Sequence, residues 1–85
     1  MPVISIFFGI VIRMYYEDHD PAHFRAEYQG QRAKFAFDGS LLAGNIRSAT
    51  ARRHIAEWAK LHQTALEANW RNMRAGRPNR AAKLR

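Results

Sequence analysis

The chain of 85 residues contains no cysteine. Disulfides, thiolate zinc sites and a thiol nucleophile are therefore excluded, and the composition fits a reducing cytosol. No apolar run is long enough to cross a membrane, because Arg13 interrupts the N-terminal stretch MPVISIFFGIVIRMYY. This stretch also lacks a basic residue before its apolar part and a small-residue cleavage site. We therefore expect a soluble, unprocessed, cytoplasmic protein that makes no contact with a membrane.

Acidic residues are scarce, and the last part of the chain has none. The net charge is +7, with fourteen Lys and Arg against seven Asp and Glu. Six of the basic residues lie in the last part of the chain, residues 71–85: Arg71, Arg74, Arg77, Arg80, Lys83 and Arg85. The folded body is therefore nearly neutral. Such a segment is typical of proteins that bind phosphates or an acidic partner, and a solvated end that only aids solubility has the same composition.

The chain does contain short segments in which apolar and polar side chains alternate with a period of two, as in strands. These segments are residues 10–17, 23–28 and 32–37. Turn signals flank them at Asp20-Pro21, Gln29-Gly30 and Asp38-Gly39. Residues 40–43 can add a short strand, and residues 3–8 can add another that is broken or bulged at Gly9. The pattern predicts a small antiparallel meander.

After the strands, the apolar period becomes that of a helix. Ser48 or Asn45 can cap its start, and Gly76 and Pro78 end it. One face carries a continuous stripe: Ile55, Trp58, Ala59, His62, Ala65, Leu66, Asn69, Trp70 and Met73. The stripe extends over about seven turns, or roughly 40 Å, which is long for so small a sheet. Either the helix breaks near His62, or its far end meets another molecule.

These elements define the expected architecture. The fold class is α+β, with an antiparallel β-meander of three to five strands packed against one long C-terminal helix, continuous or kinked. We assign residues 1–75 to a single domain and residues 76–85 to a flexible basic tail. Trp58 and Trp70 anchor the helix on the sheet, with contact to a partner as the alternative for Trp70.

The segment EDHDPAHFRAEY concentrates acids and histidines and raises the question of a metal site. His19 and His23 have the spacing of a helical zinc site, but Pro21 lies between them and excludes a helix there. A loop site using both histidines and the two neighbouring aspartates is possible. Zinc, however, needs three or four well-directed ligands with supporting hydrogen bonds. We therefore expect no metal and no cofactor, with His19 and His23 as weak metal candidates.

Strand register accounts for most of these charges. With residues 18–22 as a loop, the predicted pairs on one face are Glu17 with His23, Tyr15 with Arg25, and Arg13 with Glu27. On the other face they are Tyr16 with Phe24, Met14 with Ala26, and Ile12 with Tyr28. Pairs of opposite charge contribute about 0.2–1 kcal/mol each. Much of the charge is therefore ordinary hairpin chemistry.

One predicted pair does not fit that interpretation. With a two-residue turn after the second of these strands, Glu27 faces Arg32, but Arg25 faces Lys34. Like charges directly opposite each other are destabilising. A phosphate bound between Arg25 and Lys34, beside His23, would neutralise this repulsion. The alternative is that the two long side chains point apart into water.

Several stretches occur together: MPVIS, GIVIRMYYEDHDPAHFRAEY, DGSLLAG, EWAKLH and ANW. From Met1 to about Pro78 the chain thereby resembles the small bacterial proteins of domain-of-unknown-function family 4160. The linked pattern of DHxPxHF, EWAxLH and NW is specific. The positions that match it are Asp18, His19, Pro21, His23, Phe24, Glu57, Trp58, His62, Asn69 and Trp70. Arg25 departs from it, because many relatives have histidine there, which weakens a three-histidine metal site and leaves a cationic face.

The resemblance implies a partner and a nucleic-acid context, but no established reaction. Such proteins resemble one half of compact two-gene bacterial modules with suspected toxin–antitoxin-like roles, often beside a protein of domain-of-unknown-function family 2442. We therefore predict a nucleic-acid-associated component of such a module. The predicted phosphate-binding residues are Arg25, Lys34, Arg71, Arg74, Arg77, Arg80 and Lys83.

Two other functions stay open. A metal-independent ribonuclease-type toxin would use the same sheet face, with His23, Arg25, Tyr15 and Glu27 as candidate catalytic residues, because these side chains move protons and stabilise phosphate charge. A protein–protein interaction component without direct nucleic-acid contact would dock its partner through the long helix and the tail. The sequence leaves open whether the protein is an enzyme.

Overall fold

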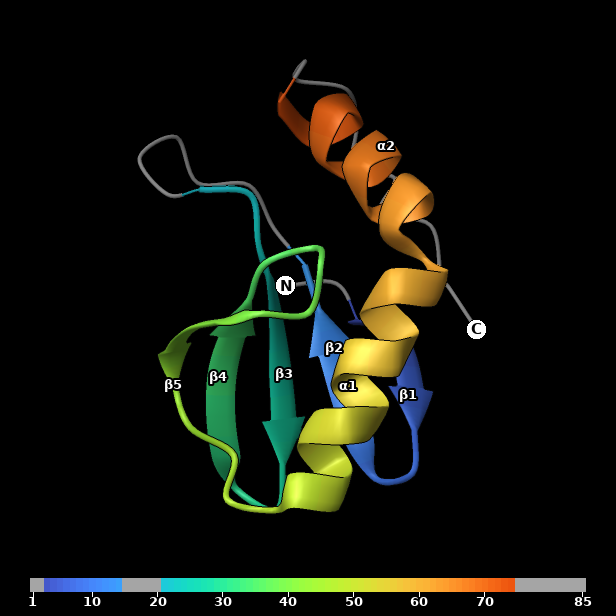
Figure 1. Ribbon diagram of the computed structural model, residues 1–85. Helices are drawn as coiled ribbons and strands as arrows, with labels where there is room; N and C mark the ends of the chain where they lie inside the picture. Colours follow the sequence, from blue (N-terminus) through green and yellow to red (C-terminus); the bar gives the residue numbers. More distant parts are fainter. Residues whose placement is uncertain (1–2, 15–20, 75–85) are drawn as a thin grey trace.

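The computed structural model describes residues 3–14 and 21–74. Five strands precede two helices: β1 (Val3–Phe7), β2 (Ile10–Arg13), β3 (Phe24–Tyr28), β4 (Gln31–Phe35), β5 (Leu41–Gly44), α1 (Ala49–Leu61) and α2 (Gln63–Arg74). The strands form one antiparallel sheet in chain order (Figure 1). The predicted α+β meander is therefore confirmed. The predicted tail, residues 76–85, lies outside the described residues.

Helix α1 packs on one face of the sheet, and α2 continues beyond the end of the strands (Figure 1). The core lies between the sheet and the helices, where burial of apolar side chains provides the main stabilisation. Its buried members from the strands and their ends are Ile4, Ile10, Ile12, Met14, Phe24, Ala26, Ala33, Phe35 and Phe37. Those from the later segments are Ile46, Ala51, Ile55, Trp58, Ala59 and Leu66. No described element covers the opposite face, which we call the open face.

The hairpin between β3 and β4 has the predicted register. Gln29 and Gly30 form its two-residue turn with φ of 49° and 77°, the positive values that such a tight turn requires. Arg25 consequently lies opposite Lys34, and Glu27 lies opposite Arg32. A similar turn with positive φ joins β1 to β2 at Phe8 and Gly9. The interruption expected at Gly9 is therefore a turn between two strands.

The predicted register between β2 and β3 was wrong by two residues. Arg13 lies opposite Arg25 instead of Glu27, and Ile12 lies opposite Ala26 instead of Tyr28. Arg25 and Ala26 thus have partners two residues earlier in the chain than predicted, where the expected partners were Tyr15 and Met14. A shift of two residues leaves every side chain on its predicted face, so apolar alternation alone cannot fix the register. Among the described residues, the last pair between these strands is Arg13 with Arg25.

The predicted long helix is two helices. Ser48 caps α1, with its Oγ accepting a hydrogen bond of 3.0 Å from the amide of Ala51. The first helix ends at His62, whose φ of −111° and ψ of 16° depart from helical values. Helix α2 follows at once, and the amide of Leu66 donates to the His62 carbonyl at 2.9 Å. Of the two possibilities raised by the apolar stripe, the break near His62 is the one observed.

The new direction of α2 brings Trp70 over the end of the sheet. Its ring centroid lies 5.8 Å from that of His23 and 6.1 Å from that of Phe37, both in edge-on geometry. Trp58 stacks on Phe7 at 5.6 Å and meets Phe24 edge-on at 5.4 Å. The two tryptophans thus anchor the two helices separately. Neither helix in the described part of the chain is long and apolar enough to span a membrane.

Candidate nucleic-acid interface

Three cations occupy consecutive strands of the open face. Arg13 on β2 lies opposite Arg25 on β3, which lies opposite Lys34 on β4. We call these three residues the cationic row. Because neighbouring strands are 4.7–4.9 Å apart, the row spans about 10 Å across the sheet. It stops at β5, where the residue opposite Lys34 is Ala43.

Glu27 is the acidic side chain within this face. Its Oε1 lies 3.3 Å from Nε of Arg13 and 3.9 Å from Nε of Arg32, the residue opposite it on β4. The Arg32 side chain is 75% exposed. Among the described residues of the open face, Glu27 is thus one carboxylate against four cations. The face therefore has an excess of positive charge, which attracts anions.

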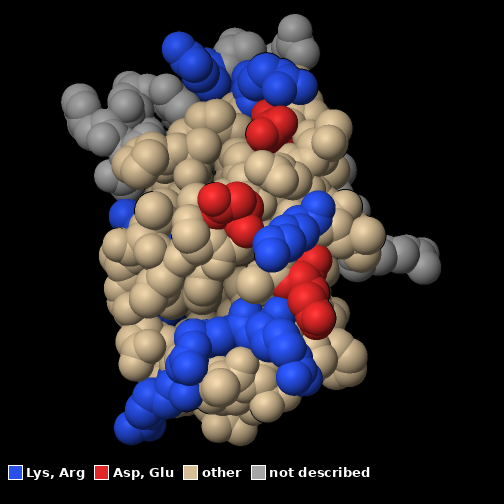
Figure 2. Space-filling model, in the orientation of Figure 1, with Lys and Arg blue, Asp and Glu red and all other residues tan. Residues whose placement is uncertain are grey.

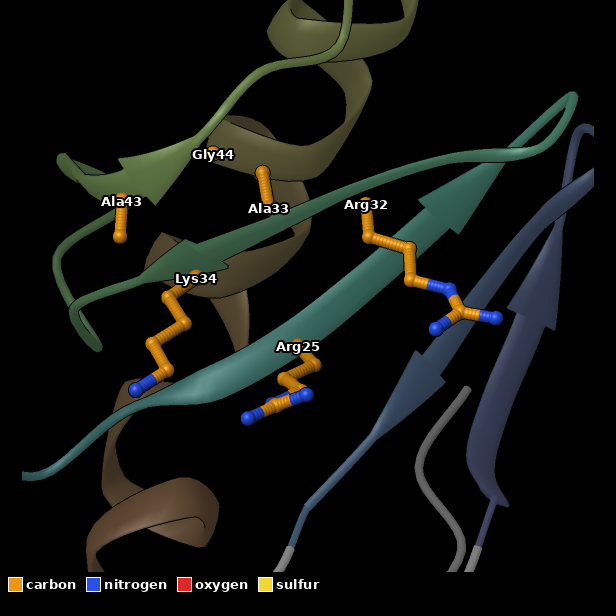
Figure 3. Close-up of a pocket in the computed structure, with 6 residues that line it drawn as sticks. All are labelled: Arg25, Arg32, Ala33, Lys34, Ala43 and Gly44. Atoms are coloured by element: carbon orange, nitrogen blue, oxygen red, sulfur yellow. The ribbon is translucent and has the colours of Figure 1, made fainter.

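A shallow hollow of about 200 Å³ lies at the β5 end of the cationic row. Its lining consists of Arg25, Arg32, Ala33, Lys34, Ala43 and Gly44. Figure 3 shows the Arg25 and Lys34 side chains extending in the same direction over one side of the sheet. The Arg32 side chain turns the other way, toward β2. We call this depression the phosphate hollow, after the candidate ligand for its two neighbouring cations, Arg25 and Lys34.

Gly44 brings β5 close enough to form one wall of the phosphate hollow. Its φ is +78°, and a Cβ atom there would lie 2.5 Å from the carbonyl oxygen of Arg32 and 3.0 Å from Cα of Ala33. The next residue, Asn45, donates a 3.1 Å hydrogen bond from its amide to the same carbonyl. Only glycine combines this backbone conformation with so close an approach.

His23 lies at the beginning of β3 and is buried, with 1% of its surface exposed. Its Nδ1 is 2.9 Å from the carbonyl oxygen of Pro21, to which a protonated Nδ1 donates, and its ring meets Trp70. It lines a second hollow of about 230 Å³ together with Pro21, Lys34, Leu42 and Ala43. The contacts with Pro21 and Trp70 give His23 a structural role, although it adjoins the cationic row through Lys34.

The other predicted site residues have different locations. Arg25 and Glu27 share the open face with Lys34, whereas Tyr15 and His19 lie outside the described residues. In the two described stretches, no group of three or more His, Cys, Asp or Glu side chains is placed to hold a metal ion.

The basic residues near the C-terminus are only partly described. Arg71 and Arg74 lie in the last turn of α2 and are exposed. A cation at this end of a helix interacts favourably with the helix dipole, so these residues also have a structural role. The other predicted phosphate-binding residues of this segment lie outside the described part of the chain: Arg77, Arg80 and Lys83.

The helical side of the molecule carries charges of both signs. Figure 2 shows acidic groups among the basic ones over most of this side and a basic band at the lower end, over the start of α1. Arg52 belongs to this part of the chain, and its Nη1 donates to the carbonyls of Ile46 at 2.5 Å and Arg47 at 2.9 Å. Arg52 thus secures the entry to the helix.

Sequence reasoning missed an exposed apolar patch near the β1–β2 turn. Phe8 is 74% exposed and Leu61 is 79% exposed. Both line a hollow of about 250 Å³ whose other lining residues are Phe7, His54, Glu57 and Trp58. The Phe8 ring stacks on that of His54 at 4.3 Å. We call Phe8, Leu61 and His54 the apolar patch. The sequence feature that could have indicated this patch is Gly9: a turn at Phe8 and Gly9 places the Phe8 side chain outside the core.

Fold and site together define a small α+β protein with a basic sheet face that no element of residues 3–14 and 21–74 covers. Residues 9–71 match the family model described as Domain of unknown function (DUF4160). The chain therefore belongs to this family, as the sequence resemblance predicted. No curated protein and no solved structure matches it. The family description states no activity, so the function is argued from the geometry of the open face.

Proposed function

We propose that the protein binds nucleic-acid phosphates through its open face, as one component of a toxin–antitoxin-like two-gene module in the bacterial cytoplasm. The observation that carries this proposal is the alignment of Arg13, Arg25 and Lys34 on three neighbouring strands. Like charges directly opposite each other on a sheet are unfavourable. Phosphates placed over the row would offset this repulsion with charge-assisted hydrogen bonds.

The chemistry of the row suits phosphate groups. Arginine offers a planar fork that binds two phosphate oxygens at once, and lysine offers a compact point charge. Contacts of this kind position a protein on nucleic acid without reading its sequence. We therefore propose binding to the backbone, with an affinity that falls steeply as salt is added.

Binding is a better-supported function than hydrolysis. A ribonuclease of the predicted type would need a group that transfers protons on the open face. Glu27 lies between two arginines, and His23 is buried against Trp70. Neither arrangement favours proton exchange with a bound strand.

Fluorescence anisotropy with labelled single-stranded RNA and duplex DNA tests the proposal. We compare the protein with Arg25→Gln/Lys34→Gln at about 50 and 200 mM salt. Removing two phosphate contacts should weaken binding at least tenfold and lower the salt slope by about two. Arg53→Gln/Lys60→Gln is the matched control, because it removes the same charge from exposed positions on α1.

Equal losses in the sheet variant and the helix control would contradict the proposal, because they would indicate attraction by net charge alone. A chain that ends after residue 75 separates the contribution of the basic tail. If this shortened chain retains the difference between the two double variants, the open face binds independently of the tail.

A second function, as a protein-interaction component, is favoured by the apolar patch. Monomeric proteins seldom leave large apolar side chains clustered at the surface unless the cluster binds something. We propose a protein of domain-of-unknown-function family 2442 as the partner. Co-expression followed by nuclease treatment and co-purification tests it. Phe8→Ser/Leu61→Ser should abolish co-purification, whereas Leu41→Ser/Leu42→Ser, at exposed positions on β5, should leave it intact.

A further inference from the structure

We infer that the phosphate hollow binds the terminal phosphate of a nucleic-acid strand in preference to an internal one. This inference rests on the proposed function, since it names the part of the nucleic acid that the open face recognises. Three features of the hollow carry it: its position in the row, the charge around it and its shape.

The hollow lies where the cationic row ends. Moving across the sheet from β2, the row presents Arg13, then Arg25, then Lys34, and the next position on β5 is the uncharged Ala43. A nucleic-acid strand whose phosphates follow the cationic row therefore reaches the last two cations, Arg25 and Lys34, at the hollow. A strand end fits this geometry, because its chain leaves in one direction only, back along the row toward β2.

The charge around the hollow suits a phosphomonoester. Arg25 and Lys34 lie directly opposite each other, so their two positive charges adjoin one small site. Arg32, the third cation of the lining, turns toward Glu27, with 3.9 Å between its Nε and Oε1 of Glu27. A phosphodiester within a strand carries one negative charge. A terminal phosphate carries about −1.5 to −2 near neutral pH and has three acceptor oxygens. The terminal group thus balances both cations, while an internal group balances one.

The shape of the hollow suits a small anion better than a base. Its volume of about 200 Å³ corresponds to the share of about seven water molecules in the liquid. The lining offers the methyl group of Ala43 and the backbone of Gly44, while the side chain of Ala33 is buried in the core. It contains no aromatic ring for stacking and no amide side chain for reading a base edge. Arg25 and Lys34 are left as the groups that select the ligand.

The test uses RNA oligomers of one sequence with a 5′-phosphate, a 3′-phosphate or hydroxyl groups at both ends. The fluorophore is attached at an internal position, and the full-length protein is titrated at pH 7.5. We expect one phosphorylated end to bind about tenfold tighter than the hydroxyl form, the effect of one charge-assisted hydrogen bond. The preference should shrink below about pH 6, where the second ionisation of the monoester is lost.

Variants locate the preference. Lys34→Gln should remove the tenfold difference between phosphorylated and hydroxyl ends, whereas Lys60→Gln, on the helical side, should preserve it. Equal binding of all three oligomers by the wild-type protein would overturn the inference, and the proposed function would stand if Arg25→Gln/Lys34→Gln still weakened all of them. A preference that survives in Lys34→Gln would overturn the assignment to this hollow. Affinity unaffected by the double variant would overturn the proposed function as well.

Discussion

Arg25 on β3 lies directly opposite Lys34 on β4 and directly opposite Arg13 on β2. A central strand position with a cation on each side is unfavourable for folding, because like charges across a strand pair repel each other. Where a protein departs from such local preferences, the departure is commonly found at a functional site. The arrangement is consistent with the phosphate binding that we propose for the open face.

Lys34→Glu should stabilise the protein and weaken nucleic-acid binding. The change converts the like-charged pair with Arg25 into a pair of opposite charge, which should raise the free energy of unfolding by about 0.2–1 kcal/mol. It also places a carboxylate beside the phosphate hollow. Urea denaturation measures the first effect, and anisotropy with RNA measures the second.

Arg32→Glu is the matched control for this prediction. It makes the same change of charge one row away, but it places a second carboxylate opposite Glu27 and removes an ion pair. It should therefore lower the free energy of unfolding by up to about 1 kcal/mol. Changes of the same sign in the two variants would show that cross-strand charge does not govern stability on this face.

Trp70→Ala should destabilise the fold through the loss of its contacts with His23 and Phe37. The loss should be about 3 kcal/mol, at the low end for Trp→Ala because Trp70 is half-buried. Trp70→Phe should recover much of this loss, since it keeps an aromatic ring. Urea denaturation checks both. A loss below about 0.5 kcal/mol would instead favour Trp70 as a residue that faces a partner.

Several features of the fold were predictable from short stretches of sequence. The Gln29-Gly30 turn determines the register of β3 and β4, and with it the Arg25–Lys34 pair. Strand alternation assigned the side chains of β2, β3 and β4 to the correct faces. The register of β2 and β3 was not predictable in this way, because the sequence places no two-residue turn signal directly between these strands and any even shift preserves the faces. Arg13 was consequently missed as a member of the cationic row.

The surroundings of His23 were also beyond reach of the sequence. Alternation places His23 on the same side of the strand as Arg25, which predicts an accessible histidine beside the cations. Its burial depends on Trp70, which arrives from α2 only because the helix changes direction at His62. A long-range contact of this kind leaves no trace in local periodicity. The interpretation of His23, one of the four candidate catalytic residues, therefore needed the tertiary structure.

Ser40→Ala should raise the pKa of Asp38. The Ser40 hydroxyl donates to Oδ1 of Asp38 at 2.7 Å and the Ser40 amide donates at 2.9 Å, and these bonds lower the pKa of the carboxyl below its usual 3.8. A lowered pKa stabilises the fold above about pH 3.8, and this contribution is lost as the pH falls through the folded-state value. Carboxyl ¹³C NMR measures the shift. Ser48→Ala should leave the pKa of Asp38 unchanged, and an unchanged value in Ser40→Ala would contradict the prediction.

Gly44→Ala should destabilise the protein far more than Gly30→Ala. Both glycines have φ near +77°, so both substitutions incur about 1–2 kcal/mol for an L residue in the left-handed region. At Gly30 the added methyl group meets no atom within 4 Å, but at Gly44 it meets the Arg32 carbonyl at 2.5 Å. Gly44→Ala must therefore move β5 away from β4 as well, which opens the phosphate hollow. Urea denaturation should show an additional loss in Gly44→Ala, and anisotropy should show weaker binding of a phosphorylated RNA end in that variant alone. Equal losses of stability in the two variants would contradict this prediction, because they would show that β5 can move away from β4 without loss of free energy.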